Sequence, residues 1–316
     1  MKDVTISPLS RLLIPVKNID LFRNTLPFLE MAARIMKEDL ERIDLLHVVG
    51  GSFLTEHLNN IDIRAGHVLS SEVMQRLRDR HHQELVRPLL ADIQALLDSS
   101  KVTLRGKIRV EDGDPVKKLC SVCEDEHYST LVVSRRKKDE GSEMDTVVSG
   151  VLHHYLNASV YVIGENGFPA GRSPAARIMI GVDGSQASHR AVREAALLLS
   201  RAASEVEEVA LVNVRDPSCF FDDSGTNCQE ASETGFNCIR DAERVLVEAG
   251  VDAAKIVPML LFGRPGETLT TYASSFDATI CFIGRRDRSN IARVLLGSVC
   301  GDMINHCRKT TLALVS

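Results

Sequence analysis

The chain has 316 residues, enough for two domains of ordinary size, and 44% of them are hydrophobic and 26% charged. Its net charge is −5 and it has no Trp, so neither a basic face nor stacking rings favour a nucleic acid partner. No apolar run approaches the ~20 residues of a membrane span, and the N-terminus lacks a signal-peptide pattern. The eight cysteines are scattered, so we predict reduced thiols and a cytoplasmic protein. Together with the charge and the missing apolar span, this predicts no nucleic acid partner and no membrane partner.

Short apolar runs alternate with helical patterns along the first half of the chain. A polar turn at residues 17–20 follows the first run. Strands are predicted at residues 12–16, 44–49, 102–110, 130–133 and 159–163. Helices are predicted at residues 25–37, 70–97, 116–126 and 146–156.

The same order of elements begins again after a stretch rich in Gly, Pro and Ser, which is typical of a linker. RIMIGV at 177–182 repeats RLLIPV at 11–16. Strands are predicted at 177–182, 209–214, 256–262, 279–283 and 311–315, and helices at 186–203, 239–249, 267–276 and 297–306. A polar insertion at 216–234 precedes the second of these helices. This domain-sized repeat predicts one domain at 1–164, a linker at 165–176 and a second domain at 177–316.

Alternating strands and helices predict an α/β protein of two tandem, doubly wound, five-stranded parallel-sheet domains, with helices on both faces of each sheet. Ligands bind such sheets beyond the carboxyl ends of the strands, where the winding reverses. If the strand order is 3-2-1-4-5, this reversal lies between the first and fourth strands. In the second half the loops at that place are residues 183–185 and 284–297.

The second of these loops has the features of an anion site. Residues 281–299 read CFIGRRDRSNIARVLLGSV, in which Gly284 ends an apolar run and Gly297-Ser298 opens a helical pattern. A strand, a glycine-containing loop and a helix start place free N–H groups and a positive helix end together. We therefore predict that this loop binds phosphate.

These residues resemble the universal stress protein family, whose nucleotide-binding members carry Gly-x2-Gly-x9-Gly-Ser/Thr after the fourth strand. Gly284 and Gly297-Ser298 match this pattern, whereas Asp287 stands in the place of the second Gly. Asp183 matches the family's Asp at the end of the first strand. The resemblance covers nearly the whole chain in element order, but the motif is specific only in the second half.

Two further positions match the family: Val214, which would lie against the adenine, and Gly263 after the third strand. The resemblance implies that the second half binds an adenine nucleotide, ATP or AMP, with Mg as a companion cation. Arg286, or Arg285 beside it, could add charge-assisted bonds to the phosphates, and so could the helix start with Ser298 and Val299. The charge of Asp287 opposes an anion by on the order of a few kcal/mol.

The first half departs further from the motif. Ser134 stands where Gly284 does, Ser149-Gly150 where Gly297-Ser298 does, and Lys17 where Asp183 does. We therefore expect a structural first domain without a nucleotide. Family members commonly pair through their last strands, so the resemblance implies an internal pseudo-dimer, with a further homodimer as an open alternative.

The function predicted on this basis is regulatory: nucleotide occupancy in a stress-response protein alters its affinity for an unidentified protein partner. The alternative is a nucleotide-free interaction module whose basic loops at 135–138 and 285–288 dock an acidic partner. The sequence has no P-loop, GxSxG or GxGxxG motif, so it supports no enzymatic activity beyond a slow ATPase.

The cysteines admit two interpretations. Cys120, Cys123 and His127 are spaced as one face of a helix, which would suit a metal half-site or a redox pair. The favoured interpretation is that the two cysteines form a buried helix stripe, because free Cys is among the most buried residue types. Reactive thiols are an alternative for Cys219, Cys228 and Cys238 around the polar insertion.

Overall fold

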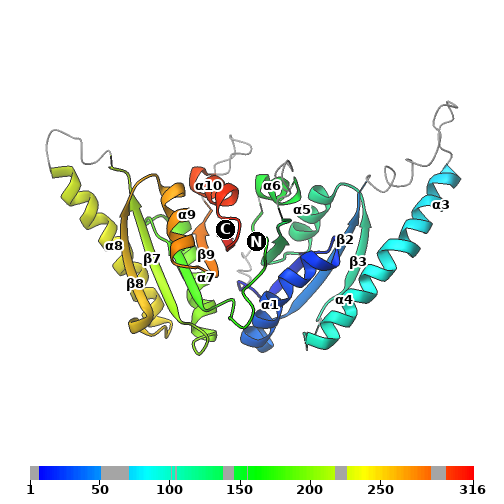
Figure 1. Cartoon of the computed structure of the whole chain (residues 1–316), viewed down its shortest axis with the longest axis horizontal. Coiled ribbons are helices and arrows are strands. Elements are labelled where there is room, and N and C mark those ends of the chain that lie inside the picture. Colours follow the sequence, from blue (N-terminus) through cyan, green and yellow to red (C-terminus); the bar gives the residue numbers. More distant parts are fainter. Residues whose placement is uncertain are drawn as a thin grey trace, which may run out of the picture.

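A computed structural model describes residues 7–50, 71–100, 102–103, 105–137, 146–154, 156–217, 226–285 and 297–316, with only the backbone of 71–74, 146 and 226–231. The chain forms three layers, with helices on both faces of one mixed sheet (Figure 1). Figure 1 shows α6 and α10 on either side of the middle of the molecule, and α3 and α8 at its two ends.

The first half contributes strands β1 (Arg11–Pro15), β2 (Arg42–Val49), β3 (Ile108–Asp112), β4 (Thr130–Ser134) and β5 (Ser159–Ile163). The second half contributes β6 (Arg177–Gly181), β7 (Glu208–Arg215), β8 (Ile256–Phe262), β9 (Ile280–Gly284) and β10 (Thr311–Val315).

The helices of the first half are α1 (Ile19–Met36), α3 (Ser71–His81), α4 (Arg87–Ser100), α5 (Pro115–Asp125) and α6 (Thr146–His153), and a π-helical turn (His82–Val86) joins α3 to α4. Those of the second half are α7 (Gln186–Arg201), α8 (Thr226–Glu248), α9 (Pro265–Ser275) and α10 (Ser298–His306). Short 3-10 turns lie at Lys37–Asp39 and Ala253–Lys255. Among the described helices, none has the length and apolar character needed to cross a membrane.

The strands are ordered β3-β2-β1-β4-β5-β10-β9-β6-β7-β8 in a single ten-stranded sheet. Within each half the pairing is parallel and the order is 3-2-1-4-5, so the predicted fold class and order are confirmed. β5 and β10 pair antiparallel, with Tyr161 opposite Ala313, which joins the halves through their last strands as the resemblance implied. The predicted linker lies between β5 and β6, while the exact domain bounds stay a prediction.

Three predicted elements begin six or more residues away from their start in the structure. The first helix begins at Ile19 because the Asn18 side chain accepts a 2.9 Å bond from the N–H of Leu21 and caps it, so the predicted polar turn is a helix start. β3 begins at Ile108, whereas the strand was predicted from residue 102. The helix predicted from 239 already begins at Thr226, so α8 takes in part of the polar insertion.

Two apolar clusters, one on each face of the sheet, each extend across both halves. The first includes Phe28, Tyr161, Ala195 and Phe282, which come from α1, β5, α7 and β9. The second packs α5 and α6 of the first half and α9 and α10 of the second against the other face. The two halves therefore share both hydrophobic cores.

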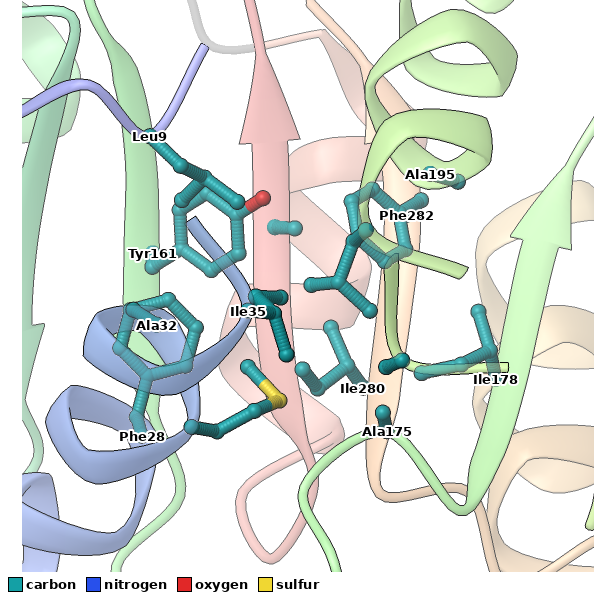
Figure 2. Packing of buried hydrophobic residues seen from close by; sticks show 14 of the residues in the cluster. Leu9, Phe28, Ala32, Ile35, Tyr161, Ala175, Ile178, Ala195, Ile280 and Phe282 are labelled. Carbon is teal, nitrogen blue, oxygen red and sulfur yellow. The ribbon is translucent and has the colours of Figure 1, made fainter. Parts of the chain in front are cut away.

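The centre of the first cluster is the ring of Tyr161, which is fully buried. Its centroid lies 5.0 Å from that of Phe28 and 6.0 Å from that of Phe282, and the second pair meets edge to face (Figure 2). One aromatic contact therefore lies within the first half and the other crosses the β5–β10 junction.

A buried carboxyl group crosses the same junction. Glu194 of α7 accepts bonds of 2.7 Å from the hydroxyls of Ser159 and Tyr161, both on β5. Burial raises the pKa of Glu194 above its ordinary value, and the two hydrogen bonds oppose this rise without cancelling it. Folding therefore favours the protonated form of this carboxyl group.

This rise predicts a stability that falls with pH. A carboxyl group whose pKa is higher in the folded state loses stabilisation as the pH climbs above its unfolded pKa of about 4.5. Glu194→Gln keeps a neutral group able to bond both hydroxyls, so we expect it to remove this decline. The gain at neutral pH is about 1.4 kcal/mol for each pKa unit of the rise. Urea unfolding at several pH values measures it.

Glu248→Gln, at an exposed position of α8, is the matched control for the exchange of a Glu for a Gln. A constant difference between the wild type and Glu194→Gln over the same pH range would contradict the proposed role of Glu194.

Candidate functional site

The predicted crevice of the second half begins where β6 ends beside β9. Ile178, Met179 and Ile180 of β6 pair with Ile280, Cys281 and Phe282 of β9, so the loops that follow leave neighbouring strands at one edge. This is the reversal point of the strand order, where α/β sheets bind ligands. The position of the two predicted loops is therefore confirmed for the segments that the structure describes.

Asp183 occupies an exposed turn after β6. Its carboxylate accepts a 2.9 Å bond from the N–H of Ser185, and its own N–H donates to the hydroxyl of Ser188 at 3.2 Å. Ser185 in turn caps α7 by accepting from the N–H of Ser188. Gly184 between them has φ +79°, which favours glycine. The turn is thus fixed by local bonds, with the Asp183 side chain at the surface.

The end of β7 lies next to this turn. Val214 is half-buried, pairs with Leu261 of β8 and packs against the cluster on the α9 and α10 face. The Cys238 thiol on α8 would be 2.8 Å from a Cβ on Gly184, so α8 also borders this place. Burial raises the pKa of Cys238, which argues against a reactive thiol there.

Gly263 has a structural reason to be glycine. Its φ of +150° is unusual for other residues, and a Cβ would lie 2.3 Å from the Thr268 hydroxyl. Its N–H donates to the carbonyl of Arg215 at the end of β7. These contacts form the turn from β8 into α9, and a contact of Gly263 with a ligand stays a prediction.

Gly284 is likewise required by packing within the protein. A Cβ there would lie 2.2 Å from the backbone carbonyl of Ala187 and 2.6 Å from the nitrogen of Ser188, in the first turn of α7. In the first half, Ser134 takes this position and bonds Thr25 of α1 at 2.5 Å between hydroxyls. The glycine therefore permits close approach of a helix, which the motif alone did not reveal.

Gly297 differs from these two glycines. It is the N-cap residue of α10, with φ −55°, and no described atom lies within 4 Å of a Cβ built on it. Within the described chain no side chain caps this helix start. Ser298 follows exposed, and half-buried Val299 packs against the core, which anchors the first turn. The described part of the protein thus gives no packing reason for a glycine here.

Arginine side chains after β4 and β9 form a symmetrical pair of contacts between the halves. Arg135 is buried and donates to the carbonyl of Ile304 in the last turn of α10 at 2.5 Å. Arg285 donates to the carbonyl of Leu156, beyond the end of α6, at 2.7 Å. Each guanidinium satisfies a carbonyl near the end of a helix, where positive charge is favourable.

This use of Arg285 and Arg135 changes two expectations. The Arg285 side chain points to the first half, so it is not placed to bind a phosphate of the second. The first arginine of each basic loop is also engaged inside the molecule, which weakens the proposal that these loops dock an acidic partner. Arg286, Asp287 and the rest of residues 286–296 lie outside the described residues, as does Lys138 of the other loop.

The predicted helix face of Cys120, Cys123 and His127 does not exist in full. α5 ends at Asp125, and His127 follows with φ +53°, outside the helix. Both cysteines are buried, and burial raises their pKa values to about 11 and about 12. The core interpretation is therefore confirmed. Among the described residues there is no cluster of three or more His, Cys, Asp or Glu side chains suited to a metal.

A dense polar cluster in the first half was not predicted. Asp44 on β2 is fully buried, receives a 2.7 Å bond from the N–H of Lys107, and contacts Arg42 and the hydroxyl of Tyr128. Burial would raise the pKa of Asp44, but these bonds outweigh it and the pKa lies below its ordinary value. Glu126 completes the cluster through Arg42 at 2.9 Å. These groups satisfy one another, as in a structural ion network.

Comparisons with known proteins agree with this architecture. The model of the universal stress protein family matches residues 175–314. A universal stress protein from Archaeoglobus fulgidus DSM 4304 is similar over 97% of this chain and 98% of its own, with a TM-score of 0.67 and 15% identity. A protein of unknown function from Pseudomonas aeruginosa PAO1 is similar over 97% of this chain and 92% of its own, with a TM-score of 0.56 and 12% identity. No curated protein matches the chain.

The fold and the reversal point define a duplicated, doubly wound α/β protein. The second half belongs to the universal stress protein family, and the two halves together have the fold of a tandem universal stress protein. At these identities the likeness to the solved structures establishes the fold.

The two motif glycines should respond differently to substitution. Gly284→Ala forces a Cβ onto the backbone of α7, so we expect the free energy of unfolding to fall by about 1–3 kcal/mol. Gly297→Ala meets no described atom and should cost less than about 1 kcal/mol. Urea unfolding of the two variants measures the difference. Equal losses would show that helix packing is not what requires Gly284.

The arginine contacts predict a second stability effect. Arg135→Ala and Arg285→Ala each remove a charged donor from a carbonyl of the other half, so each should lower the free energy of unfolding by about 1–3 kcal/mol. Arg264→Ala is the control because that side chain is exposed and pairs only with exposed Glu267 in the described chain. Urea unfolding in which all three variants match the wild type would contradict the assigned role.

Proposed function

We propose that the second half binds an adenine nucleotide at the carboxyl edge of β6 and β9, and that the first half is its structural partner. The observation that carries this proposal is the start of α10. Gly297 has no described neighbour within 4 Å of a Cβ, and no described side chain caps the N–H groups of the first turn. Such groups at a helix N-terminus bind phosphate oxygens, and a glycine leaves space for the ligand.

Asp183 and Val214 support the same ligand from the neighbouring strands. The Asp183 side chain is exposed in a turn fixed by Ser185 and Ser188, so it is held in place and accessible. Its carboxylate can accept bonds from ribose hydroxyls, and half-buried Val214 offers an apolar surface to a base. In this proposal Ser298 and the N–H groups of α10 receive the phosphates, with Mg as a companion of ATP.

The first half lacks the corresponding helix start. Ser149-Gly150, the counterpart of Gly297-Ser298, lies inside α6, which already begins at Thr146. A Cβ on Gly150 would lie 2.6 Å from the Val116 side chain, so this glycine serves the packing of α6 on α5. Lys17 is exposed where the second half has Asp183. These differences support a single nucleotide site in the second half.

Arg285 connects the proposed site with the first half of the molecule. Arg285 follows β9 directly, accepts a 3.1 Å bond from Arg190 at its carbonyl, and donates to Leu156 of the first half. A ligand bound beside the end of β9 would also bear on this contact between the halves. We therefore propose a cytoplasmic regulatory protein of the stress response, whose nucleotide occupancy alters its affinity for a protein partner.

Thermal unfolding with ATP, ADP and AMP tests the proposal. A ligand that binds only the folded state stabilises it by about 2.7 kcal/mol at a hundredfold excess over the dissociation constant. We expect the melting temperature to rise with nucleotide concentration. Its constancy up to millimolar concentrations of all three nucleotides would refute the proposed ligand class.

Paired substitutions locate the site. Asp183→Ala should weaken binding, whereas Lys17→Ala at the equivalent position should leave it unchanged. Gly297→Val should abolish binding with little loss of stability, because no described atom lies within 4 Å of a Cβ at this position. Asp287→Gly should tighten binding, since it removes a negative charge from the loop. Titration calorimetry measures each affinity, and unchanged affinity in Gly297→Val and Asp287→Gly would exclude this loop as the phosphate site.

A further inference from the structure

A cavity of about 800 Å³ lies between the first half and the segment that joins the two halves. Its wall comes from the second part of α1, from residues between α4 and β3, and from residues 168–174, which lead from β5 to β6. Figure 1 shows the end of α4 at the lower edge of the molecule, opposite α6 and α10. The cavity is therefore separate from the proposed nucleotide site, and its volume is typical of small-molecule sites.

One part of the wall is apolar. Half-buried Pro27 and Ala33 of α1 face the cavity together with the half-buried ring of Phe168 in the joining segment. Buried Met31 and Leu40 lie behind them. This part of the wall favours the burial of a hydrocarbon chain or an aromatic ring.

The rest of the wall is mostly cationic. The charged residues that the structure places around the cavity are Arg34, Lys37, Arg105 and Arg172, with Glu30 as the single acidic one. Four basic side chains against one carboxyl group favour a ligand with negative charge. Together with the apolar part, this excess indicates a ligand that is both apolar and anionic.

Ion pairs with the second half hold two of these arginines in place. Arg34 on α1 pairs with Glu205 at 2.8 Å, and Arg172 pairs with Glu207 at 2.6 Å and with Asp277 at 2.5 Å. A guanidinium has five N–H donors, so these pairs leave donors for a ligand oxygen. The cationic part of the wall is therefore fixed by contacts that cross between the halves.

Lys37 has no such partner, since its ammonium group forms no ion pair and no hydrogen bond with the described chain. The acidic residues that follow it, Glu38 and Asp39, pair with Arg105 and Arg201 instead. Lys37 ends α1 with φ +49°, a conformation that is costly for a residue with a side chain. The cavity wall thus carries a positive charge that the described protein does not neutralise.

We propose that this cavity binds a small organic anion. The apolar body of the ligand lies against Ala33 and Phe168, and its carboxylate, phosphate or sulfonate group faces Lys37 and Arg34. The apolar wall gives a bare inorganic anion little to contact, and the basic side chains offer nothing to a neutral hydrocarbon. Because the duplicated fold has one joining segment, the site belongs to the whole chain and not to either half alone.

Two fluorescent probes with the same rings test this inference in the full-length protein. Anilinonaphthalene sulfonate carries a negative charge, and phenylnaphthylamine lacks the sulfonate. We expect the anionic probe to bind saturably and more tightly than the neutral one. Lys37→Gln should raise the dissociation constant of the anionic probe about fivefold, the effect of one charge at about 4 Å in water, and leave that of the neutral probe unchanged. Lys117→Gln, at an exposed position of α5, is the matched control.

Glu30→Gln should have the opposite effect. It removes the acidic side chain of the wall, so the anionic probe should bind more tightly by a similar factor. Glu30 and Lys37 are both exposed, and thermal unfolding should show that both variants fold like the wild type. Failure of the anionic probe to bind saturably, an affinity unchanged in both variants, or an equal change in Lys117→Gln would overturn the inference.

Discussion

The antiparallel pairing of β5 with β10 is the constraint on which the rest of this molecule depends. It turns two five-stranded sheets into one and lets each helical layer pack across both halves. The pairing has a specific centre, where Tyr161 contacts rings from both halves and donates to buried Glu194 of α7. Both hydrophobic clusters therefore contain residues of the two halves.

Because of the same pairing, the residues that follow β4 and β9 form hydrogen bonds between the halves. It brings the carboxyl end of each sheet near the last helix of the other half, so Arg135 and Arg285 can each satisfy a carbonyl there. The proposed nucleotide site lies close to these contacts. A ligand at the start of α10 and the Arg135 contact in its last turn would thus act on opposite ends of one nine-residue helix.

Individual residues show that a sequence motif predicts where a residue lies but not why that residue type is needed there. Gly284 and Gly297 are both glycines of the motif. A Cβ on Gly284 would clash with the backbone of α7, whereas a Cβ on Gly297 would contact no described atom. Pattern matching could not separate these reasons, since helix proximity depends on distant residues. Arg285 was one of two arginines expected near a phosphate, and it instead donates to the carbonyl of Leu156 in the other half. Asp44 gave no sequence signal, since its partners are distant along the chain.

The sequence by itself determined the duplication, the α/β class, the strand order within each half and most strand bounds, because hydrophobic periodicity and turn residues are local properties. It also placed Asp183 and Gly297 at the reversal point of the sheet. The tertiary structure decided what depends on contacts between remote segments: the two buried hydrogen bonds from β5 to Glu194, and the bonds that Arg135 and Arg285 each donate to a carbonyl of the other half. These contacts become visible only when the chain is folded, because residues far apart in the sequence form them.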